Sequence, residues 1–402
     1  MLISLLQFLG DLLSFKVPSV FTYYSTRMIL ASLMSLFLTI SLGPYCILKL
    51  YNLKTGQSIR VSDCPLLAKL HEKKKHTPTM GGVLMLFSII ISLLCFMDIT
   101  SIFTIILLFA TLVLGAVGMI DDYLKMKHKN AKGLPGRIKL LMQLSLSLLI
   151  ALYLLVPGFA NALETKSSLS PPSAKEYKME KSKNPEQLSL SEYQSIYYLP
   201  FMKSPFFVVS GAGMLIALFI TMFVITGASN AVNLSDGLDG LAPGLIMMVS
   251  AVLALFGFLS NHVYFAKYLN ILYIESSGEI AIFLSAIFGA NLGFLWFNSH
   301  PAQVFMGDTG SLSLGGLLGI CAVLLRREFL FALVGGVFVI EALSVILQVL
   351  SYKLRNKKRI FLCAPIHHHF EYKGWHETKV VARFWIVGLV LAVIGIASLK
   401  FQ

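Results

Sequence analysis

The chain has 402 residues and a formal net charge of +13, with 56% hydrophobic and only 13% charged residues. Soluble globular domains carry roughly 25% charged residues, so this composition excludes an ordinary soluble domain and indicates a surface that largely faces lipid. The five cysteines are scattered and include no CxxC pair, which argues against both a disulfide framework and a zinc site.

Apolar runs recur from one end of the chain to the other. Runs of about 18 to 23 residues match the roughly 20 that an α-helix needs to cross a bilayer. The first strongly apolar run lacks the charged start and small-residue cleavage site of a secretory signal, so we expect it to remain as a span. The runs predict one all-α, polytopic membrane domain over residues 1–402, with about ten transmembrane helices. The predicted spans are residues 21–47, 80–97, 101–120, 138–159, 206–226, 241–259, 279–297, 311–325, 330–352 and 381–399.

Basic residues are unevenly distributed among the connections between these spans. The connections after the first, third and ninth spans, residues 48–79, 123–139 and 353–383, hold 21 of the 33 lysines and arginines. By the positive-inside rule these connections are cytoplasmic, and both termini are then periplasmic. The same distribution accounts for the net charge, so we expect no nucleic-acid partner.

A long polar segment, residues 163–200, follows the fourth span. It is rich in serine, proline, lysine and glutamate, a composition too polar to form a core by itself. The alternation of sides places it opposite the basic connections. We therefore expect a periplasmic loop insertion that is disordered or loosely folded and has no catalytic part.

The third span ends in GAVGMIDDYLK, which places Asp121 and Asp122 directly after an apolar helix, with Lys125 close behind. Adjacent carboxylates repel each other unless a cation lies between them or one binds a proton, so the pair suggests a metal or base site. The simpler alternative is a solvated helix end. The lysines that follow suit a site that holds Mg2+ next to an anionic substrate.

The connection after the fifth span reads NAVNLSDGLDGLAPG and sets Asn230, Asn233, Asp236 and Asp239 among glycines. Amide and carboxylate oxygens in a glycine-rich turn can bind Mg2+ or a sugar phosphate, because glycine lets the backbone approach the ligand. The same residue types also form ordinary turns between helices, and the sequence leaves both explanations open.

The connection after the seventh span reads WFNSHPAQVFMGDTGSLSLGG and supplies Asn298, Phe305, Asp308 and Ser311 ahead of a small-residue helix. Asp, Thr and Ser cap helices well, so a plain N-cap is one explanation. A helix N-terminus with a carboxylate beside it can equally seat a phosphate-bound Mg2+.

The connection after the ninth span holds three consecutive histidines, His367, His368 and His369, which could ligate a metal, pair with phosphates or shuttle protons. Within the ninth span, an ionised Glu341 costs about 2.5 to 3.5 kcal/mol on insertion, so a structural partner for it is favoured over a catalytic role. Gln348 follows seven residues later and shares its helical face.

All four clusters fall on the side that the basic residues define as cytoplasmic. Neither the lysines nor the apolar runs depend on these acids and histidines, so the agreement is independent support. It predicts one composite site at one membrane face.

Five strings along the chain resemble a known superfamily. They are HTPTMGG at 76–82, DDYLK at 121–125, NAVNLSDGLDGLA at 230–242, MGDTGSL at 306–312 and PIHHHFE at 365–371. These strings are similar to those of the polyprenyl-phosphate N-acetylhexosamine-1-phosphate transferases. Within that superfamily, PIHHHFE and the GWHE and RFW that follow favour the phospho-N-acetylmuramoyl-pentapeptide transferases. The departures are slight: His76 stands where glycine is common, and Ser235 where threonine is common.

The resemblance implies transfer of phospho-MurNAc-pentapeptide from UDP-MurNAc-pentapeptide to undecaprenyl phosphate, giving UMP and lipid I, the first membrane step of peptidoglycan synthesis. It implies Mg2+ as cofactor and the bacterial cytoplasmic membrane as location, with the active site facing the cytoplasm. The residues agree, because joining a nucleotide to a lipid phosphate needs Mg2+ and lysines to offset phosphate repulsion.

The resemblance also suggests roles. Asp308 is expected to be the chief Mg2+ ligand, and Asp121 the base that activates the lipid phosphate or, alternatively, a covalent phospho-aspartate. Asp122 would support the metal or the base, and His367 is expected among the catalytic residues. The uridine end of the substrate is assigned to Asn233, Asp236, Asn298 and Phe305. The remaining pocket is assigned to Lys74, Thr79, Lys125, Ser311, Gln348, His368 and His369.

Two other functions stay open on the sequence. A GlcNAc-1-phosphate transferase acting on the same lipid differs only in its sugar nucleotide. A membrane transporter would place ionisable groups near the bilayer midplane and show inverted repeats, whereas the acids of interest here lie at one edge and no repeat is found. A homodimer is compatible with the sequence, but no residue run indicates one.

Overall fold

The computed structural model describes residues 18–53, 74, 77–128, 133–156, 174–176, 186–202 and 204–400. Within them, nine helices are long and apolar enough to cross a membrane. The prediction of an all-α polytopic membrane protein is confirmed. The second predicted span, residues 80–97, is a shorter apolar helix, α4 (Gly82–Phe96).

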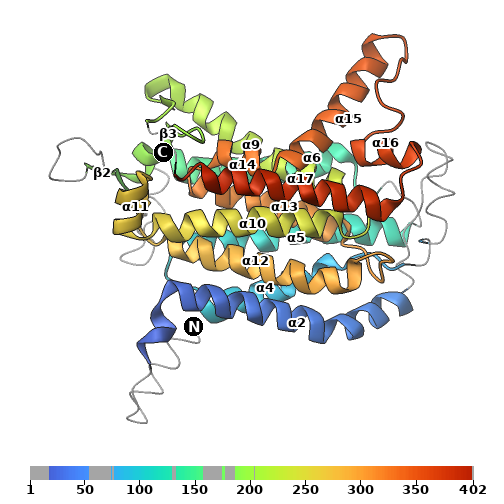
Figure 1. Ribbon diagram of the computed structural model, residues 1–402, viewed down its shortest axis with the longest axis horizontal. Coiled ribbons are helices and arrows are strands. Elements are labelled where there is room, and N and C mark those ends of the chain that lie inside the picture. Colours follow the sequence, from blue (N-terminus) through green and yellow to red (C-terminus); the bar gives the residue numbers. More distant parts are fainter. Residues whose placement is uncertain are drawn as a thin grey trace.

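The long helices run side by side in a bundle (Figure 1). They are α2 (Tyr24–Asn52), α5 (Ile102–Lys127), α6 (Gly136–Leu155), α9 (Met214–Ser235), α10 (Leu241–Ser260), α12 (Ser277–Asn298), α13 (Gly307–Leu324), α15 (Gly336–Leu354) and α17 (Glu377–Ala397). The shorter elements are η1 (Ser19–Thr22), α8 (Leu190–Gln194), η3 (Gly211–Gly213), α11 (Val263–Leu269), α14 (Glu328–Val334), α16 (Ile366–Tyr372) and the strands β1 (Ala174–Glu176), β2 (Glu186–Leu188), β3 (Ile196–Tyr197), β4 (Phe207–Val208) and β5 (Tyr273–Ile274).

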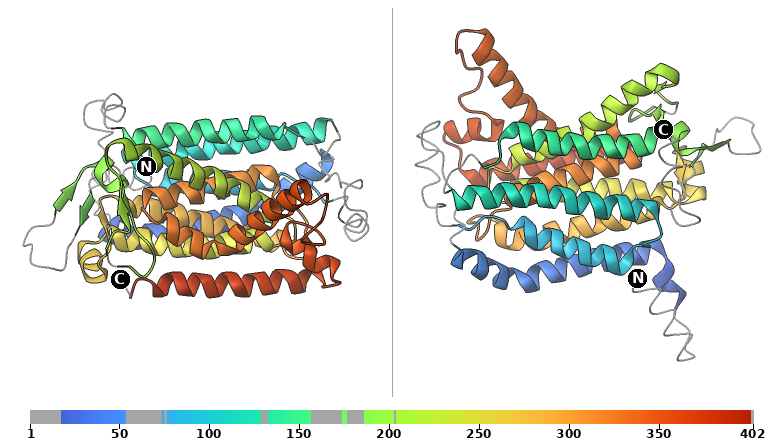
Figure 2. Two further views of the ribbon diagram at one scale, coloured as in Figure 1. Left: turned by 90° about the horizontal axis from the view of Figure 1, so that it is seen from above. Right: turned by 180° about the vertical axis from the view of Figure 1, so that it is seen from behind.

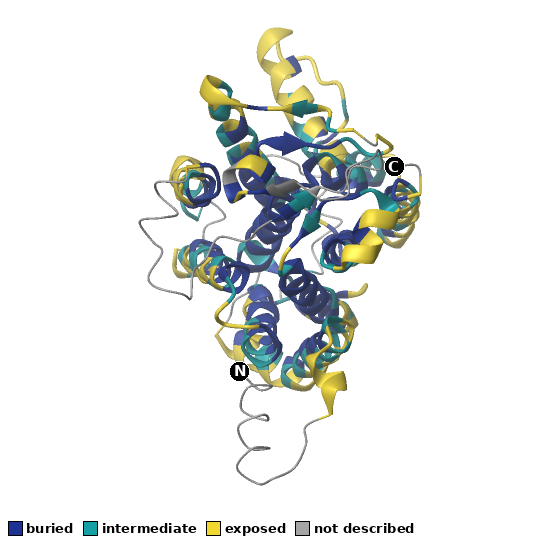
Figure 3. Cartoon of the chain, turned by 90° about the vertical axis from the view of Figure 1, so that its left-hand side faces the viewer, coloured by how far each residue is buried: buried dark blue, intermediate teal, exposed yellow. Residues whose placement is uncertain are grey.

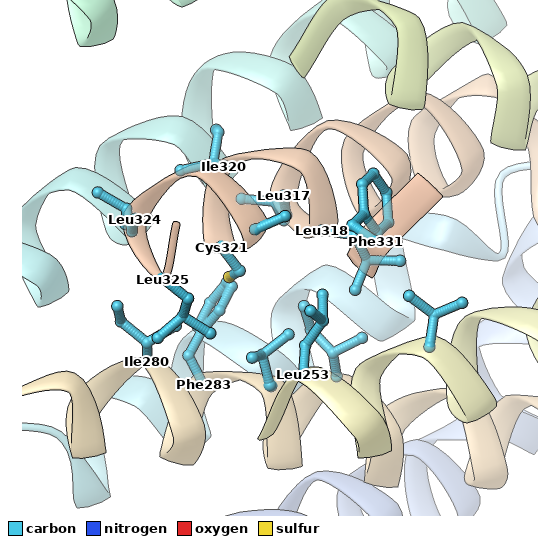
Figure 4. Packing of buried hydrophobic residues seen from close by; sticks show 14 of the residues in the cluster. Leu253, Ile280, Phe283, Leu317, Leu318, Ile320, Cys321, Leu324, Leu325 and Phe331 are labelled. Atoms are coloured by element: carbon cyan, nitrogen blue, oxygen red, sulfur yellow. The ribbon is translucent and has the colours of Figure 1, made fainter. Parts of the chain in front are cut away.

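Helix α13 is the centre of the bundle. Its side chains from Thr309 to Leu324 are all buried, and its apolar face packs against α10, α12 and α14 (Figure 4). Seen from above, α17 lies on one flank and α6 on the other (Figure 2). Viewed end-on, buried residues face the interior while many exposed residues cover the outer faces of the helices (Figure 3). Exposed apolar side chains on these outer faces suit contact with lipid tails.

Glycines let α13 approach its neighbours closely. A Cβ atom added at Gly118 of α5 would lie 2.5 Å from the backbone oxygen of Asp308, and one added at Gly82 of α4 would lie 2.1 Å from the backbone nitrogen of Gly310. Real Cβ atoms do not approach so closely, so the two crossings require glycine. The crossings bring the start of α13 against α5.

Several of the predicted span boundaries are wrong. The apolar runs end near residues 120 and 226, but α5 continues to Lys127 and α9 to Ser235, because polar side chains can occupy a last helical turn whose backbone hydrogen bonds persist. The predicted span 330–352 is broken between α14 and α15 at the pair Gly335–Gly336. Beyond the break, α15 leans away from the bundle (Figure 1).

The expectation of a disordered or loose segment over 163–200 is wrong for residues 186–200. Strand β1 pairs with β2 and β5, and β3 pairs with β4, all antiparallel. Tyr193 and Tyr197 are fully buried, and the guanidinium of Arg326 lies 4.2 Å from the ring centroid of Tyr197. Aromatic side chains therefore supply a local core that the average composition of the segment does not predict. Residues 163–173 and 177–185 lie outside the described residues.

The elements sort to two ends of the bundle (Figure 1). The start of α2 and the end of α17 lie at the same end as α11, β2 and β3. The C-terminal ends of α2, α5, α9, α12 and α15 lie at the other end, as strict alternation of the spans requires. The predicted site residues lie at or beyond these helix ends.

Candidate active site

Three carboxylates meet where α5 ends and α13 begins. Asp121 and Asp122 lie in the last two turns of α5, and Asp308 lies in the first turn of α13. One oxygen from each lies within 4.8 Å of the others. Residues 186 positions apart in the chain thus form one cluster, because the Gly118 crossing places the start of α13 beside α5.

Asp122 caps helix α13. Its Oδ1 accepts a hydrogen bond from the backbone N–H of Asp308 at 3.1 Å, and its Oδ2 accepts from the backbone N–H and the hydroxyl of Thr309 at 2.9 and 2.7 Å. These N–H groups have no partner inside the helix. Because both of its oxygens are engaged by the start of α13, Asp122 fits the positioning of Asp308 better than direct contact with a substrate.

Two lysines bridge the other two carboxylates. Lys125 Nζ lies 2.6 Å from Asp121 Oδ2 and 3.0 Å from Asp308 Oδ1. Lys139, from α6, lies 2.9 Å from Asp308 Oδ2 and 3.3 Å from Asp121 Oδ2. The ammonium groups therefore occupy the positions between the carboxylates where positive charge is required.

The donor set fits a divalent cation such as Mg2+. Its ligand atoms are all carboxylate oxygens, which hard cations prefer. The Asp308 side chain is 14% exposed, which gives an ion access, whereas Asp121 is fully buried. Both oxygens of Asp122 are held by donors of α13, whereas Asp308 Oδ2 and Asp121 Oδ2 contact lysine ammonium groups, which a divalent cation could replace, so Asp308 and Asp121 are the better ligands for such an ion.

Neighbouring polar groups complete this cluster. Asn233 donates to Asp308 Oδ1 at 3.1 Å and to the hydroxyl of Ser311 at 2.8 Å. The backbone N–H of Leu134 donates to Asp121 Oδ1 at 2.6 Å, and a Cβ atom at Gly133, where φ is +53°, would lie 2.5 Å from that oxygen. Residues 133–134, just before α6, thus lie against Asp121.

Asp236 lies in the turn between α9 and α10 and is half-buried. Burial raises the pKa of its carboxyl to about 7, and the negative charges of Asp308, Asp122 and Asp239 raise it further. The pKa of Asp236 therefore depends on the charge of the carboxylate cluster. Its protonation near neutral pH is coupled to any cation or proton that neutralises that cluster.

A second cluster lies around Lys74. Its Nζ lies 2.6 Å from Asp239 Oδ1 and 2.6 Å from Glu377 Oε1, and it lies 5.9 Å from the centroid of the half-exposed Phe305 ring. His300 Nδ1 lies 3.0 Å from Asp239 Oδ2. An ammonium group beside an aromatic face can hold an anionic, ring-containing substrate.

The histidines lie on α16, close to the turn between α9 and α10. His367 Nδ1 lies 3.1 Å from Glu341 Oε2 in a geometry that does not form a hydrogen bond, and both side chains are fully buried, so His367 is the polar neighbour of Glu341 within the span. A Cβ atom at Gly237 would lie 2.3 Å from His367 Nε2. His368 Nδ1 lies 2.6 Å from Glu371 Oε2, and His369 Nδ1 accepts from the backbone N–H of Leu362.

Two amides assigned to the substrate pocket bind the backbone instead. Asn298 accepts from the N–H of Gly240 at 2.9 Å and donates to the carbonyl of Val304 at 2.8 Å. Gln348 donates to the carbonyl of Phe361 and accepts from two N–H groups of the same loop. Both side chains therefore fix loops at the site end. Thr79 lies against Gly307, whose added Cβ would lie 2.8 Å from the Thr79 hydroxyl.

Three residues of these clusters were not singled out from the sequence: Lys139, His300 and Glu377. Asp239 was noted as part of the glycine-rich turn but was given no specific role. Lys139 could have been noticed as a basic residue at the start of an apolar span, on the same side as Asp121. Glu377 carries no such signal, because an acidic residue in a first helical turn is common for helix-dipole reasons alone.

Comparisons with known proteins agree with this geometry. A family model described as glycosyl transferase family 4 matches residues 104–326. The phospho-N-acetylmuramoyl-pentapeptide-transferase of Protochlamydia amoebophila (strain UWE25) is 59% identical over 410 residues, covering 100% of both chains. This chain belongs to the phospho-N-acetylmuramoyl-pentapeptide transferase family.

Other members of the phospho-N-acetylmuramoyl-pentapeptide transferase family are also similar over their full lengths. Those of Thermodesulfovibrio yellowstonii (strain ATCC 51303 / DSM 11347 / YP87) and Francisella tularensis subsp. tularensis (strain FSC 198) are each 45% identical, over 403 and 405 residues. Membership makes the chain an integral membrane phosphotransferase, and the interpretation as a transporter is wrong.

Proposed function

We propose that this enzyme transfers phospho-MurNAc-pentapeptide from UDP-MurNAc-pentapeptide to undecaprenyl phosphate, releasing UMP and forming lipid I. The observation that carries the proposal is the cluster of Asp308, Asp121, Lys125 and Lys139 at one end of the bundle, in a chain 59% identical to a phospho-N-acetylmuramoyl-pentapeptide-transferase. Phosphoryl transfer needs little from a protein beyond positioning and charge stabilisation, and this cluster can provide both.

Asp308 and Asp121 are the proposed ligands of Mg2+. A bound Mg2+ would supply neutralisation of the diphosphate oxygens and of the leaving UMP. Asp122 holds Asp308 in place through the first turn of α13. With Mg2+ held by Asp308 and Asp121, Lys125 and Lys139 would be free to bind phosphate oxygens, so that two ammonium groups and a divalent ion would share the charge of both substrates.

Asp121 is the proposed group that activates the lipid phosphate. Its Oδ2 lies between the two lysines, so a phosphate held by the same lysines comes within reach of this carboxylate. Attack by Asp121 itself, with a phospho-aspartate as intermediate, uses the same contacts. Incubating enzyme with nucleotide sugar labelled in the β-phosphate, without lipid acceptor, distinguishes the two: label bound covalently to the protein supports the intermediate, and unlabelled protein supports direct transfer.

The nucleotide end of the donor is proposed to lie at Phe305 and Lys74, with Asn233, Asp236 and Ser311 between it and the ion. The half-exposed Phe305 ring offers a stacking face for a uracil ring, and Lys74 adds a positive charge beside it. His367, His368 and His369 lie on α16 at the same end, where they can contact the sugar or its phosphate.

The lipid acceptor is proposed to approach along α15. This helix exposes large apolar side chains on several faces along its length, including Leu343, Ile346, Leu350 and Leu354. Its C-terminal end lies at the site end of the bundle. A polyprenyl chain can lie on such a surface while its phosphate reaches the lysines, because the surface is contiguous with the lipid phase.

The site end is proposed to face the cytoplasm in the bacterial inner membrane, with both termini periplasmic, because the basic connections lie at this end. In a cysteine-free background, a thiol reagent that does not cross membranes should label Lys267→Cys in intact cells and Lys373→Cys only after permeabilisation. The reverse pattern would invert the topology.

The experiment that tests the reaction compares UMP release from UDP-MurNAc-pentapeptide and from UDP-GlcNAc by purified enzyme with undecaprenyl phosphate and Mg2+. We expect release from the first donor only. Release from UDP-GlcNAc alone would support the GlcNAc-1-phosphate transferase instead.

A further inference from the structure

Glu377 ties together the cluster around Lys74. It lies in the first turn of α17, and its Oε1 lies 2.6 Å from Lys74 Nζ. The same oxygen accepts a hydrogen bond from the backbone N–H of Asp239 at 2.8 Å, and Oε2 lies 3.5 Å from His300 Nδ1. One carboxylate therefore joins α17 to the segment before α4, the turn between α9 and α10, and the loop after α12.

The environment of Glu377 makes this pairing strong. Its side chain is 10% exposed and that of Lys74 is 16% exposed, so water screens the ion pair only weakly. The N-terminus of α17 also places the positive end of the helix dipole beside this carboxylate. The ammonium group of Lys74 thus has two fixed, negatively charged partners, Glu377 and Asp239.

The cluster resembles a metal site only in its ligand types. Asp239, His300 and Glu377 bring one ligand atom each within 4.8 Å of the others. Lys74 Nζ already lies 2.6 Å from both carboxylates, so the cation of this cluster is the lysine. The carboxylates act as its fixed counterions.

Lysine needs such fixing because its ammonium is carried on four flexible methylene groups, and an untethered one samples many positions. Lys74 is useful to a nucleotide only where it lies beside Phe305. The atoms that hold it there belong to Asp239 and Glu377, and Glu377 also fixes the backbone of Asp239. Removing the Glu377 charge loosens both at once.

We propose that Glu377 is a positioning residue for the nucleotide end of the donor, acting through Lys74. The proposal rests on the proposed function only in taking the donor to be a uridine nucleotide sugar. Glu377 sets the affinity for that donor and not the rate of the chemical step, because its contacts are with Lys74, Asp239 and His300 and not with the lysines that bridge Asp121 and Asp308.

The test is a double-mutant cycle of Glu377→Gln and Lys74→Ala in the purified full-length enzyme. We expect Glu377→Gln to raise KM for UDP-MurNAc-pentapeptide about tenfold, with kcat changed less than about threefold and KM for undecaprenyl phosphate unchanged. Combined with Lys74→Ala, it should add little to the effect of Lys74→Ala alone, because both changes remove the same interaction. Glu377→Asp, which keeps the charge, should recover part of the affinity.

A matched control is Glu192→Gln. Glu192 is also an acidic residue in a first helical turn, but it is exposed and lies in α8 at the opposite end of the bundle. Its loss should leave both KM values unchanged. Direct UMP binding, measured by calorimetry, gives a second readout that does not depend on turnover.

The proposal is overturned if Glu377→Gln leaves KM for the nucleotide and UMP binding unchanged, or if its effect simply adds to that of Lys74→Ala. It is also overturned if Glu377→Gln lowers Tm and kcat together without any change in UMP affinity. Failure of the proposed function looks different, because the unmodified enzyme would then release no UMP from UDP-MurNAc-pentapeptide.

Discussion

The two ends of the bundle both bury charged side chains but balance them differently. Away from the site, Arg326 is fully buried, pairs with Glu328, and donates to the carbonyl of Ile196 and to Gln194. At the site end, three carboxylates share two ammonium groups, and the charged groups of Lys125, Lys139 and Asp308 remain 14 to 26% exposed.

The difference separates structural charge from functional charge. A single enclosed cation with matched acceptors, such as Arg326, favours one folded arrangement and offers nothing to a ligand. Like charges held together at partial exposure leave repulsion that a divalent cation or a phosphate can relieve. The two ends should therefore respond oppositely to substitution: one in stability, the other in turnover.

The largest effect is expected from Asp308→Asn. It removes the most exposed carboxylate of the cluster, so UMP release at saturating Mg2+ should fall about a thousandfold, the loss of several kcal/mol of transition-state charge stabilisation. Tm should change little, because the substitution also relieves repulsion from Asp121. Substantial turnover by this variant would remove Asp308 from the proposed metal site.

Arg326→Met tests the enclosed end. It should lower the free energy of unfolding by about 3–5 kcal/mol, because Glu328 is left buried without its cation. Tm in detergent should fall, while kcat per folded molecule stays unchanged. The double variant Arg326→Met/Glu328→Gln should recover part of the lost stability. A large fall in kcat with unchanged Tm would show that this end takes part in the reaction.

Asp122→Asn lies between these two cases, because its carboxylate caps α13 and also holds Asp308. Replacing the carboxylate by an amide weakens the acceptor for three hydrogen-bond donors, which should reduce the free energy of unfolding by about 1–3 kcal/mol and lower Tm. Activity should fall as well, and additional Mg2+ should not restore it. If Tm is unchanged and high Mg2+ restores the rate, Asp122 is a metal ligand and its capping role is minor.

The smallest effect concerns pH. The pKa of Asp236 is raised from 3.8 to about 7, so its carboxyl is neutral in the fold at pH values where it would be ionised in the unfolded chain. The stabilising contribution is full below about pH 3.8 and is lost as pH rises through about 7. Asp236→Asn should therefore gain stability relative to wild type as pH rises to 8, measured as the difference in Tm across this range. A constant difference would contradict the coupling.

Much of the fold could be predicted because apolar length and charge alternation act along the chain. The existence of the spanning helices, their order and the convergence of DDYLK, NAVNLSDGLDG, MGDTG and HHH at one end all follow from those two properties. The helix ends at Lys127 and Ser235 do not, because hydropathy stops before the hydrogen bonds do.

The contacts inside the site were beyond sequence reasoning for a different reason. Which oxygen of Asp122 faces the start of α13, and which lysine lies between Asp121 and Asp308, depend on the rotation and depth of each helix. The folded part of residues 186–200 was missed because the composition was averaged over residues 163–200. The lysines of this longer segment precede residue 186, whereas the three buried tyrosines follow it.

The absence of a side chain at Gly118 affects which positions of the chain will be sensitive to substitution. A methyl group there would push the peptide of Asp308 away from α5, although residue 118 touches no reactant. In saturation mutagenesis of this enzyme, alanine at position 118 should therefore be as harmful as substitutions in the carboxylate cluster. Tolerance to substitution at a position should depend on how closely two helices pack there as much as on its distance from the ligand.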